Sequence, residues 1–225
     1  MSISGSKEQD YLDVDVACLN PETLRATLVS SAGSHCEVWR TNKRFRANTN
    51  KEAYHEFVIK YPTSSQSKAE IAILARDYKR LKNTLQEIIP SAIFFMTEVD
   101  GEQNVCVVAD AVNVWFNIAN PQNHEEAVQL LRDSPRAYDQ LRRFVQAARD
   151  WHSSDNSRLI DLYGLDNLIM DRNREIRYLD SFFVYFYEDM LDMFEHEADN
   201  LLARQIDISK QRLNYLEEVL KASSA

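Results

Sequence analysis

Glycine, proline and cysteine are all scarce in this chain. Its 225 residues include four glycines and five prolines, so turn-forming residues are few and helices are expected to dominate the second half. The three cysteines, Cys18, Cys36 and Cys106, are too scattered for a disulfide framework or a zinc knuckle. Three thiols also cannot all pair within one chain, which favours a reducing compartment and predicts a cytoplasmic protein.

Long apolar runs and an excess of basic residues are also absent. No stretch approaches the roughly 18 apolar residues of a membrane-spanning helix, and residues 1–9 lack the apolar core of a secretory signal. We therefore expect a soluble protein without a membrane partner. Lys and Arg number 26 against 35 Asp and Glu, a formal net charge of -9. Such a surface is poorly suited to neutralising phosphates, so no nucleic-acid partner is expected.

The hydrophobic pattern of the first half indicates a sheet with one inserted helix. Alternating or β-branched runs predict five strands, at residues 24–29, 36–40, 55–60, 91–98 and 105–109. Residues 67–85 instead have apolar residues at steps of three and four, which predicts a helix, and Ser67 with Glu70 is a candidate capping box at its start. The polar run 41–51 is expected to be an exposed loop.

The second half has mainly helical periodicity. Helices are expected at about 123–132, 135–151, 184–204 and 207–221. Two short strands, at 168–170 and 176–179, interrupt this pattern and predict a hairpin. The chain is thus divided into an N-terminal extension (1–20), a sheet-rich part (21–112) and a mainly helical part (113–225).

Three separated segments carry the polar residues that phosphoryl transfer requires. They are His55–Lys60, Ile160–Met170 and Ile176–Phe182. Phosphoryl transfer needs a cation for the phosphates and side-chain oxygens for magnesium. The order of these segments, placed after five strands with one helix, resembles the bilobal protein-kinase fold over roughly residues 24–200. Among small bacterial kinase-like chains, the sequence resembles the YrbL family associated with the PhoP regulatory network.

This resemblance implies an α+β fold of two lobes. The N-terminal lobe would be a five-stranded antiparallel sheet with one inserted helix, and the C-terminal lobe would be shortened and mainly helical. The Gly-rich kinase loop, G-x-G-x-x-G-x-V, falls on residues 31–38, where Gly33 is the one glycine of three that is kept and Val38 is the valine. Read without the resemblance, the segment is an ordinary hairpin turn.

Lys60 stands at the end of an apolar strand. In kinases this lysine binds the α- and β-phosphates of ATP and is held by a glutamate of the next helix. Glu70 is the best candidate for that glutamate, and Asp77 is a poorer one. The alternatives are a lysine that points to water and a Glu70 that serves only the capping box.

The catalytic and metal-binding loops of a kinase are represented by single residues. Asp161 would align the attacking hydroxyl as a general base, and Asn167 and Asp180 would bind magnesium. The spacing from Asp161 to Asn167 is one residue longer than in H-R-D-x-x-x-x-N, and the Phe-Gly of D-F-G is missing after Asp180. Asp166 is an alternative to Asp161. A polar turn that merely satisfies backbone amides is the non-catalytic interpretation.

The resemblance further implies that adenine pairs with backbone groups near Asp110 and Ala111. The predicted function is therefore ATP- and magnesium-dependent transfer of the γ-phosphate to a protein hydroxyl, with ATP as ligand and a protein as substrate or regulatory partner. Two alternatives are a catalytically inactive pseudokinase acting as an interaction scaffold and a small-molecule kinase of the aminoglycoside or choline type. The missing glycines and the missing Phe-Gly favour the scaffold interpretation.

Overall fold

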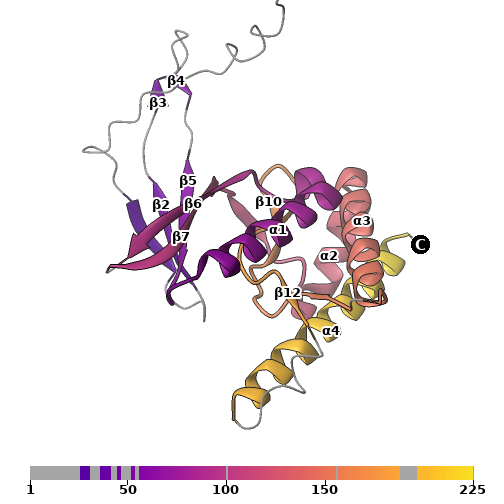
Figure 1. The fold of residues 1–225 in the computed structure, drawn as a ribbon. Helices are drawn as coiled ribbons and strands as arrows, with labels where there is room; N and C mark the ends of the chain where they lie inside the picture. Colours follow the sequence, from indigo (N-terminus) through magenta and orange to yellow (C-terminus); the bar gives the residue numbers. More distant parts are fainter. Residues whose placement is uncertain are drawn as a thin grey trace, which may run out of the picture.

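The fold is mixed α+β, with a five-stranded sheet at one side and most of the helices at the other (Figure 1). It comes from a computed structural model that describes residues 26–30, 36–41, 45–46, 52–53, 56–99, 101–155, 157–187 and 197–224. None of the helices in these ranges is both long and apolar enough to span a bilayer.

The large sheet has the strands that the sequence predicts. They are β1 (Ala26–Ser30), β2 (Cys36–Thr41), β5 (Phe57–Pro62), β6 (Ala92–Val99) and β7 (Glu102–Asp110). Their order is β1-β2-β5-β7-β6, and every neighbouring pair is antiparallel. Helix α1 (Lys68–Leu85) lies between β5 and β6 in the chain. The prediction of a five-stranded antiparallel sheet with one inserted helix is therefore confirmed.

The start of α1 is determined by its local sequence. Ser67 Oγ accepts a hydrogen bond from the Glu70 N–H at 3.3 Å, and the Glu70 carboxylate accepts one from the Ser67 N–H at 2.7 Å. This reciprocal pair satisfies two of the N–H groups that every helix leaves without a partner in its first turn. The predicted capping box is thus confirmed.

The described part of the second half contains three helices and two small sheets. The helices are α2 (His124–Arg132), α3 (Pro135–His152) and α4 (Glu197–Ser223). The first small sheet has the order β11 (Ile176–Tyr178), β10 (Leu168–Asp171) and β8 (Val114–Phe116), and the second pairs β9 (Leu159–Ile160) with β12 (Tyr185–Phe186). Short 3-10 turns stand at Gln86–Ile88 and Pro121–Asn123. The predicted helices near 123–132 and 135–151 and the predicted hairpin are confirmed.

The prediction of two separate helices, at 184–204 and 207–221, is wrong. Tyr185 and Phe186 form β12, because they pair with Ile160 and Leu159 of β9, and the last helix is continuous from Glu197 to Ser223. Its sequence has no glycine or proline that would divide it. The loop expected at 41–51 also contains one strand of a small pair, β3 (Phe45–Arg46) with β4 (Glu52–Ala53).

Helix α1 belongs to two hydrophobic clusters. Ile71 and Leu74, in its first half, pack with Val105, Val107, Ala109 and Phe182 under the large sheet. Leu81 and Leu85, in its second half, are fully buried in the main core with the helices of the second half. The helix therefore connects the sheet to the rest of the molecule, as Figure 1 shows.

Two variants distinguish helix capping by Glu70 from pairing of its negative charge with another group. We expect Ser67→Ala to lower the free energy of unfolding by about 1 kcal/mol, since the cap is lost. Glu70→Gln should change stability little, because glutamine also completes a capping box. Urea denaturation of both variants checks this, and a large loss in Glu70→Gln would mean that the negative charge has another partner.

Candidate functional site

Lys60 reaches from the sheet to the second half of the chain. Its side chain is buried, with the residue 8% exposed, and Nζ donates to the backbone oxygen of Leu179 at 2.5 Å and lies 3.4 Å from Ser181 Oγ. A buried ammonium requires such partners, since unpaired burial is costly. Val38 lies opposite Lys60 in the sheet and is half-buried. The lysine thus ends beside the two neighbours of Asp180.

The β10–β11 hairpin brings Asn167 and Asp180 together. Leu168 is paired with Tyr178, and the Leu179 N–H donates to the Asn167 carbonyl at 2.8 Å. Asn167 Nδ2 lies 3.4 Å from Asp180 Oδ2 and 3.2 Å from the backbone oxygen of Asp161. The structure therefore places Lys60, Asn167 and Asp180 in one region, with the backbone of Asp161 beside them.

Gly164 allows the close approach of the Asn167 side chain. A Cβ atom at residue 164 would lie 2.4 Å from Asn167 Oδ1, which is closer than real Cβ contacts. The Asn167 N–H also donates to the Gly164 carbonyl at 3.2 Å, closing the turn. Gly164 was not predicted to matter, although a glycine three residues before the asparagine, in a chain with four glycines, is a signal that the sequence offers.

Asp161 carries a carboxyl group with a raised pKa. Burial, and then the negative charge of Asp180, raise the pKa of Asp161 from 3.8 to about 7. Its Oδ1 accepts a hydrogen bond from the Tyr163 N–H at 2.7 Å. Asp166, in contrast, is exposed and accepts from Asn117 Nδ2 at 3.0 Å. Asp161 is thus the aspartate that the structure groups with Asn167 and Asp180.

Two residues of α4 hold the Asp161 loop and were missed by the sequence analysis. Arg212 donates to the carbonyl oxygens of Leu162 and Tyr163, and the buried Ser209 Oγ accepts from the Leu162 N–H at 3.1 Å. The positive charge of Arg212 also acts to lower the pKa of Asp161, against the larger effect of burial. These contacts join residues about 50 positions apart, and no local pattern marks them.

Glu70 is not the partner of Lys60, which corrects the sequence prediction. It is exposed and engaged with Ser67, whereas Lys60 donates to Leu179 and Ser181. The reason is local, because the capping box holds Glu70 at the outer end of α1. The alternative, Asp77, is buried and accepts from the Tyr187 hydroxyl at 3.1 Å.

The predicted nucleotide-binding backbone is only partly available. The Asp110 N–H donates to the Ser91 carbonyl at 3.0 Å, and the Ala111 N–H donates to the Glu56 carbonyl at 2.9 Å. Both donors are therefore already used within the protein, and an adenine edge would have to meet other backbone groups of this connector. Gly33 lies outside the described residues.

Cys36, on the large sheet, lies close enough to Asp180 and Lys60 for their charges to shift its pKa. Its pKa is raised to about 11, first by burial and then by the negative charge of Asp180, while Lys60 acts to lower it. The thiol stands on β2, in the segment that the sequence aligns with the Gly-rich loop. Cys36, Lys60 and Asp180 therefore share one electrostatic environment, although they come from distant parts of the chain.

Asn167 and Asp180 are the residues that would hold a magnesium ion arriving with a nucleotide. Across the described ranges, no three His, Cys, Asp or Glu residues gather as a metal site. Asn167 and Asp180 lie next to each other, with the amide nitrogen of Asn167 facing the carboxylate and the amide oxygen turned to Gly164. To bind a metal together with Asp180, the Asn167 amide would have to turn its oxygen toward the ion. Magnesium is commonly held by one or two protein groups together with substrate phosphates and water. The pair therefore suits a shared metal better than an ion held by protein alone.

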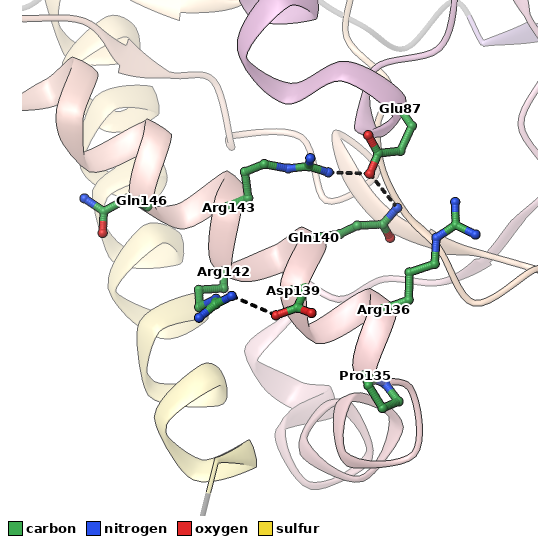
Figure 2. Close-up of a pocket in the computed structure, with 8 residues that line it drawn as sticks. All are labelled: Glu87, Pro135, Arg136, Asp139, Gln140, Arg142, Arg143 and Gln146. Carbon is green, nitrogen blue, oxygen red and sulfur yellow. Dashed lines mark hydrogen bonds and ion pairs between the residues drawn. The ribbon is translucent and has the colours of Figure 1, made fainter.

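Two cavities are formed by residues other than Lys60, Asn167 and Asp180, and the second of them is lined by Asp110 and Ala111. One, of about 880 Å³, is lined by α3 and Glu87; Figure 2 shows Arg143 and Gln140 directed at Glu87, and Arg142 at Asp139. The other, of about 410 Å³, surrounds the connector after β7. In the first cavity these charges already pair with one another, which leaves little to attract an ionic ligand.

Comparison with known proteins adds no assignment, since no protein-family model and no curated protein matches the sequence. Any functional conclusion therefore depends on the geometry above.

The electrostatic link between Cys36 and Asp180 is testable by thiol alkylation. Asp180→Asn removes a negative charge that raises the Cys36 pKa, so the thiolate fraction and the alkylation rate at pH 8.5 should rise severalfold. Lys60→Met should slow the same reaction. Cys106, whose pKa is raised by burial, is the internal reference in peptide mass spectrometry. Unchanged Cys36 rates in both variants would contradict the arrangement.

The raised pKa of Asp161 predicts a pH-dependent stability effect. The folded state binds this proton more tightly than the unfolded state, so the contribution of the group to stability falls as the pH rises from about 4 to about 7. Asp161→Asn should therefore be more stable than the parent at pH 8, by on the order of 2 kcal/mol, and show no such gain at pH 4. Urea denaturation at both pH values measures this.

Asp166→Asn is the matched control, because it removes an exposed carboxylate from the same loop. A gain for Asp161→Asn that is equal at pH 4 and pH 8 would show that the Asp161 carboxyl does not titrate as described.

Proposed function

We propose that this chain is an ATP- and magnesium-dependent phosphotransferase of protein-kinase-like type, acting in the cytoplasm, that transfers the γ-phosphate of ATP to a protein hydroxyl. The observation that supports this most strongly is the convergence of Lys60, Asn167 and Asp180. One residue comes from the sheet and two from the hairpin of the other half, which is the combination expected from the kinase resemblance.

The architecture supports the same proposal. An antiparallel five-stranded sheet with one helix after its third strand is followed by a short connector and a mainly helical half. A small bilobal kinase would have its elements in this order, which supports the proposal, and the proposed site lies where the sheet meets the β10–β11 hairpin. ATP would bind between the two halves, with its phosphates beside Lys60.

Each site residue has a definite role in this proposal. Lys60 would bind phosphate oxygens, and Asn167 and Asp180 would hold magnesium, which neutralises the charge that develops on the transferring phosphate. Asp161 would accept the proton of the acceptor hydroxyl as its oxygen bonds to the γ-phosphorus. The bond from that phosphorus to the β–γ bridging oxygen breaks, and ADP leaves with the electron pair. A base with a pKa of about 7 matches the operating pH.

A second candidate, the inactive scaffold, is favoured by the present partners of Lys60. Its ammonium donates to Leu179 and Ser181, and Glu70 is engaged in its capping box. Phosphate binding would require Lys60 to exchange the Leu179 carbonyl for a phosphate oxygen. A pseudokinase would retain the present contact and would not bind ATP.

Calorimetry with ATP and magnesium distinguishes these candidates. We expect magnesium-dependent binding to the parent chain and at least a tenfold loss of affinity, about 1.4 kcal/mol, in Asp180→Ala. Gly164→Ala keeps every polar group of the site but displaces the Asn167 amide, so it should also weaken binding. Gly101→Ala controls for the cost of replacing a glycine away from the site, because Gly101 has a positive φ of 82° that strains alanine, although the added methyl group would have no neighbour within 4 Å. It should bind ATP as the parent does.

Transfer of labelled γ-phosphate to the chain itself or to a protein mixture then tests catalysis. Asp161→Asn should retain ATP binding and lower the transfer rate by about 10²- to 10⁴-fold. In the parent, the rate should fall as the pH drops below about 7, because the base must be ionised. Magnesium-ATP affinity that is undiminished in Asp180→Ala would refute the assigned site, and no ATP binding by the parent would favour the scaffold.

A further inference from the structure

The face of the large sheet that points away from α1 carries a continuous apolar row. The strand registers place Leu28, Trp39, Ile59, Val108 and Ile93 directly beside one another, one from each of the five strands. Side chains paired across strands in this way point to the same face. Such a row would ordinarily be the core side of a sheet.

The row is open to solvent within the part of the chain that the structure describes. Leu28 is 41% exposed and Ile93 is 62% exposed, and Phe95, which follows on β6, is 48% exposed. The opposite face of β7 carries Val105 and Val107, which are fully buried under α1. Exposed apolar residues on both edge strands of the sheet, β1 and β6, indicate that another segment or molecule covers this face.

Polar groups on the same face satisfy one another. The Glu37 carboxylate accepts from the Trp39 indole N–H at 3.1 Å and from the Tyr61 hydroxyl at 2.5 Å. These contacts give the Glu37 carboxylate partners at one side of the apolar row, while the exposed carboxylates on this face, Glu102 and Asp110, stand at the two ends of β7, away from its middle. The surface therefore favours an apolar partner.

We propose that residues 11–19 of the same chain dock on this face. Their sequence, YLDVDVACL, alternates apolar residues at Leu12, Val14 and Val16 with Asp13 and Asp15. An alternating segment can lay its apolar side chains on a sheet while its carboxylates remain in water. These residues lie outside the described part of the chain, and they precede β1, which is one edge of this sheet.

The connection is long enough for this arrangement. Six residues, 20–25, separate Leu19 from Ala26, and the seven residue-to-residue steps between them span up to roughly 23 Å when the chain is extended. Five strands at a spacing of about 4.8 Å place the two ends of the row roughly 19 Å apart. The segment can therefore reach every position of the row.

Cys106 provides a probe on this face, because it pairs with Phe95 on the row's side of β7. The experiment compares the alkylation rate of Cys106 in the full-length parent with its rate in a triple variant of the full-length chain, Leu12→Asp/Val14→Asp/Val16→Asp. The triple variant should expose Cys106 and raise its rate severalfold, whereas Cys36, on the opposite face, should keep its rate. Ser2→Asp/Ser4→Asp/Ser6→Asp adds the same charge nearby and is the matched control.

Crosslinking identifies the occupant directly. In a Cys18→Ser/Cys36→Ser background, Val14→Cys should be joined to Cys106 by a short bis-maleimide within one chain. Asp15→Cys, on the other side of the segment, should react much less.

Two results would overturn the proposal. One is an equal Cys106 rate in the parent, the triple variant and the control. The other is a crosslinked product of twice the chain mass, since that would show a second copy on the face. Neither readout depends on ATP, so failure here is distinguishable from failure of the proposed function.

Discussion

The buried ammonium of Lys60 is the constraint on which the rest of the site depends. It belongs to β5, yet the groups it contacts lie 119 and 121 residues further along the chain. Burial of an amino group without partners would be costly, so the position of the sheet and the position of the Leu179–Ser181 segment are coupled. Asn167 then lies beside Asp180 because the β10–β11 hairpin has one register, and Gly164 leaves room for the amide. Each element of the site thus follows from a specific backbone or packing requirement.

Hydrophobic packing reinforces this coupling on the side of α1. Phe182, two residues after Asp180, is buried with Ile71 and Leu74 of α1. The centroids of the Phe182 and Phe94 rings lie 5.9 Å apart in an edge-to-face arrangement. Further along the same segment, the Tyr187 hydroxyl donates to the buried Asp77 of α1. Phe183, between these contacts, has a positive φ of 52°, a backbone conformation that residues other than glycine adopt at a cost in free energy. The segment after Asp180 is therefore held against α1 at two points, and its backbone conformation follows from them.

The sequence was sufficient for those elements whose signal is local. Period-two alternation located the five large strands, the spacing of Ile71, Leu74, Tyr78 and Leu81 located α1, and the capping box was read from Ser67 and Glu70. It was insufficient where a partner is distant. Tyr185 and Phe186 became a strand because β9 is available to pair with them, and the two short strands inside 41–53 were missed for the same reason. In the site, Asn167 and Asp180 were recognised from their spacing, but the partners of Lys60, and the support from Ser209 and Arg212, depend on tertiary contacts that no local pattern encodes.

The proposed function requires that an ammonium and two oxygen-bearing side chains meet at one nucleotide-binding site. A crystal structure of the full-length chain with magnesium and a nonhydrolysable ATP analogue tests this most directly. We predict that Lys60 Nζ leaves the Leu179 carbonyl for a phosphate oxygen, and that the Asn167 amide turns so that the metal lies about 2.1 Å from Asn167 Oδ1 and an Asp180 oxygen. A nucleotide bound elsewhere, with the Lys60–Leu179 contact retained, would contradict it.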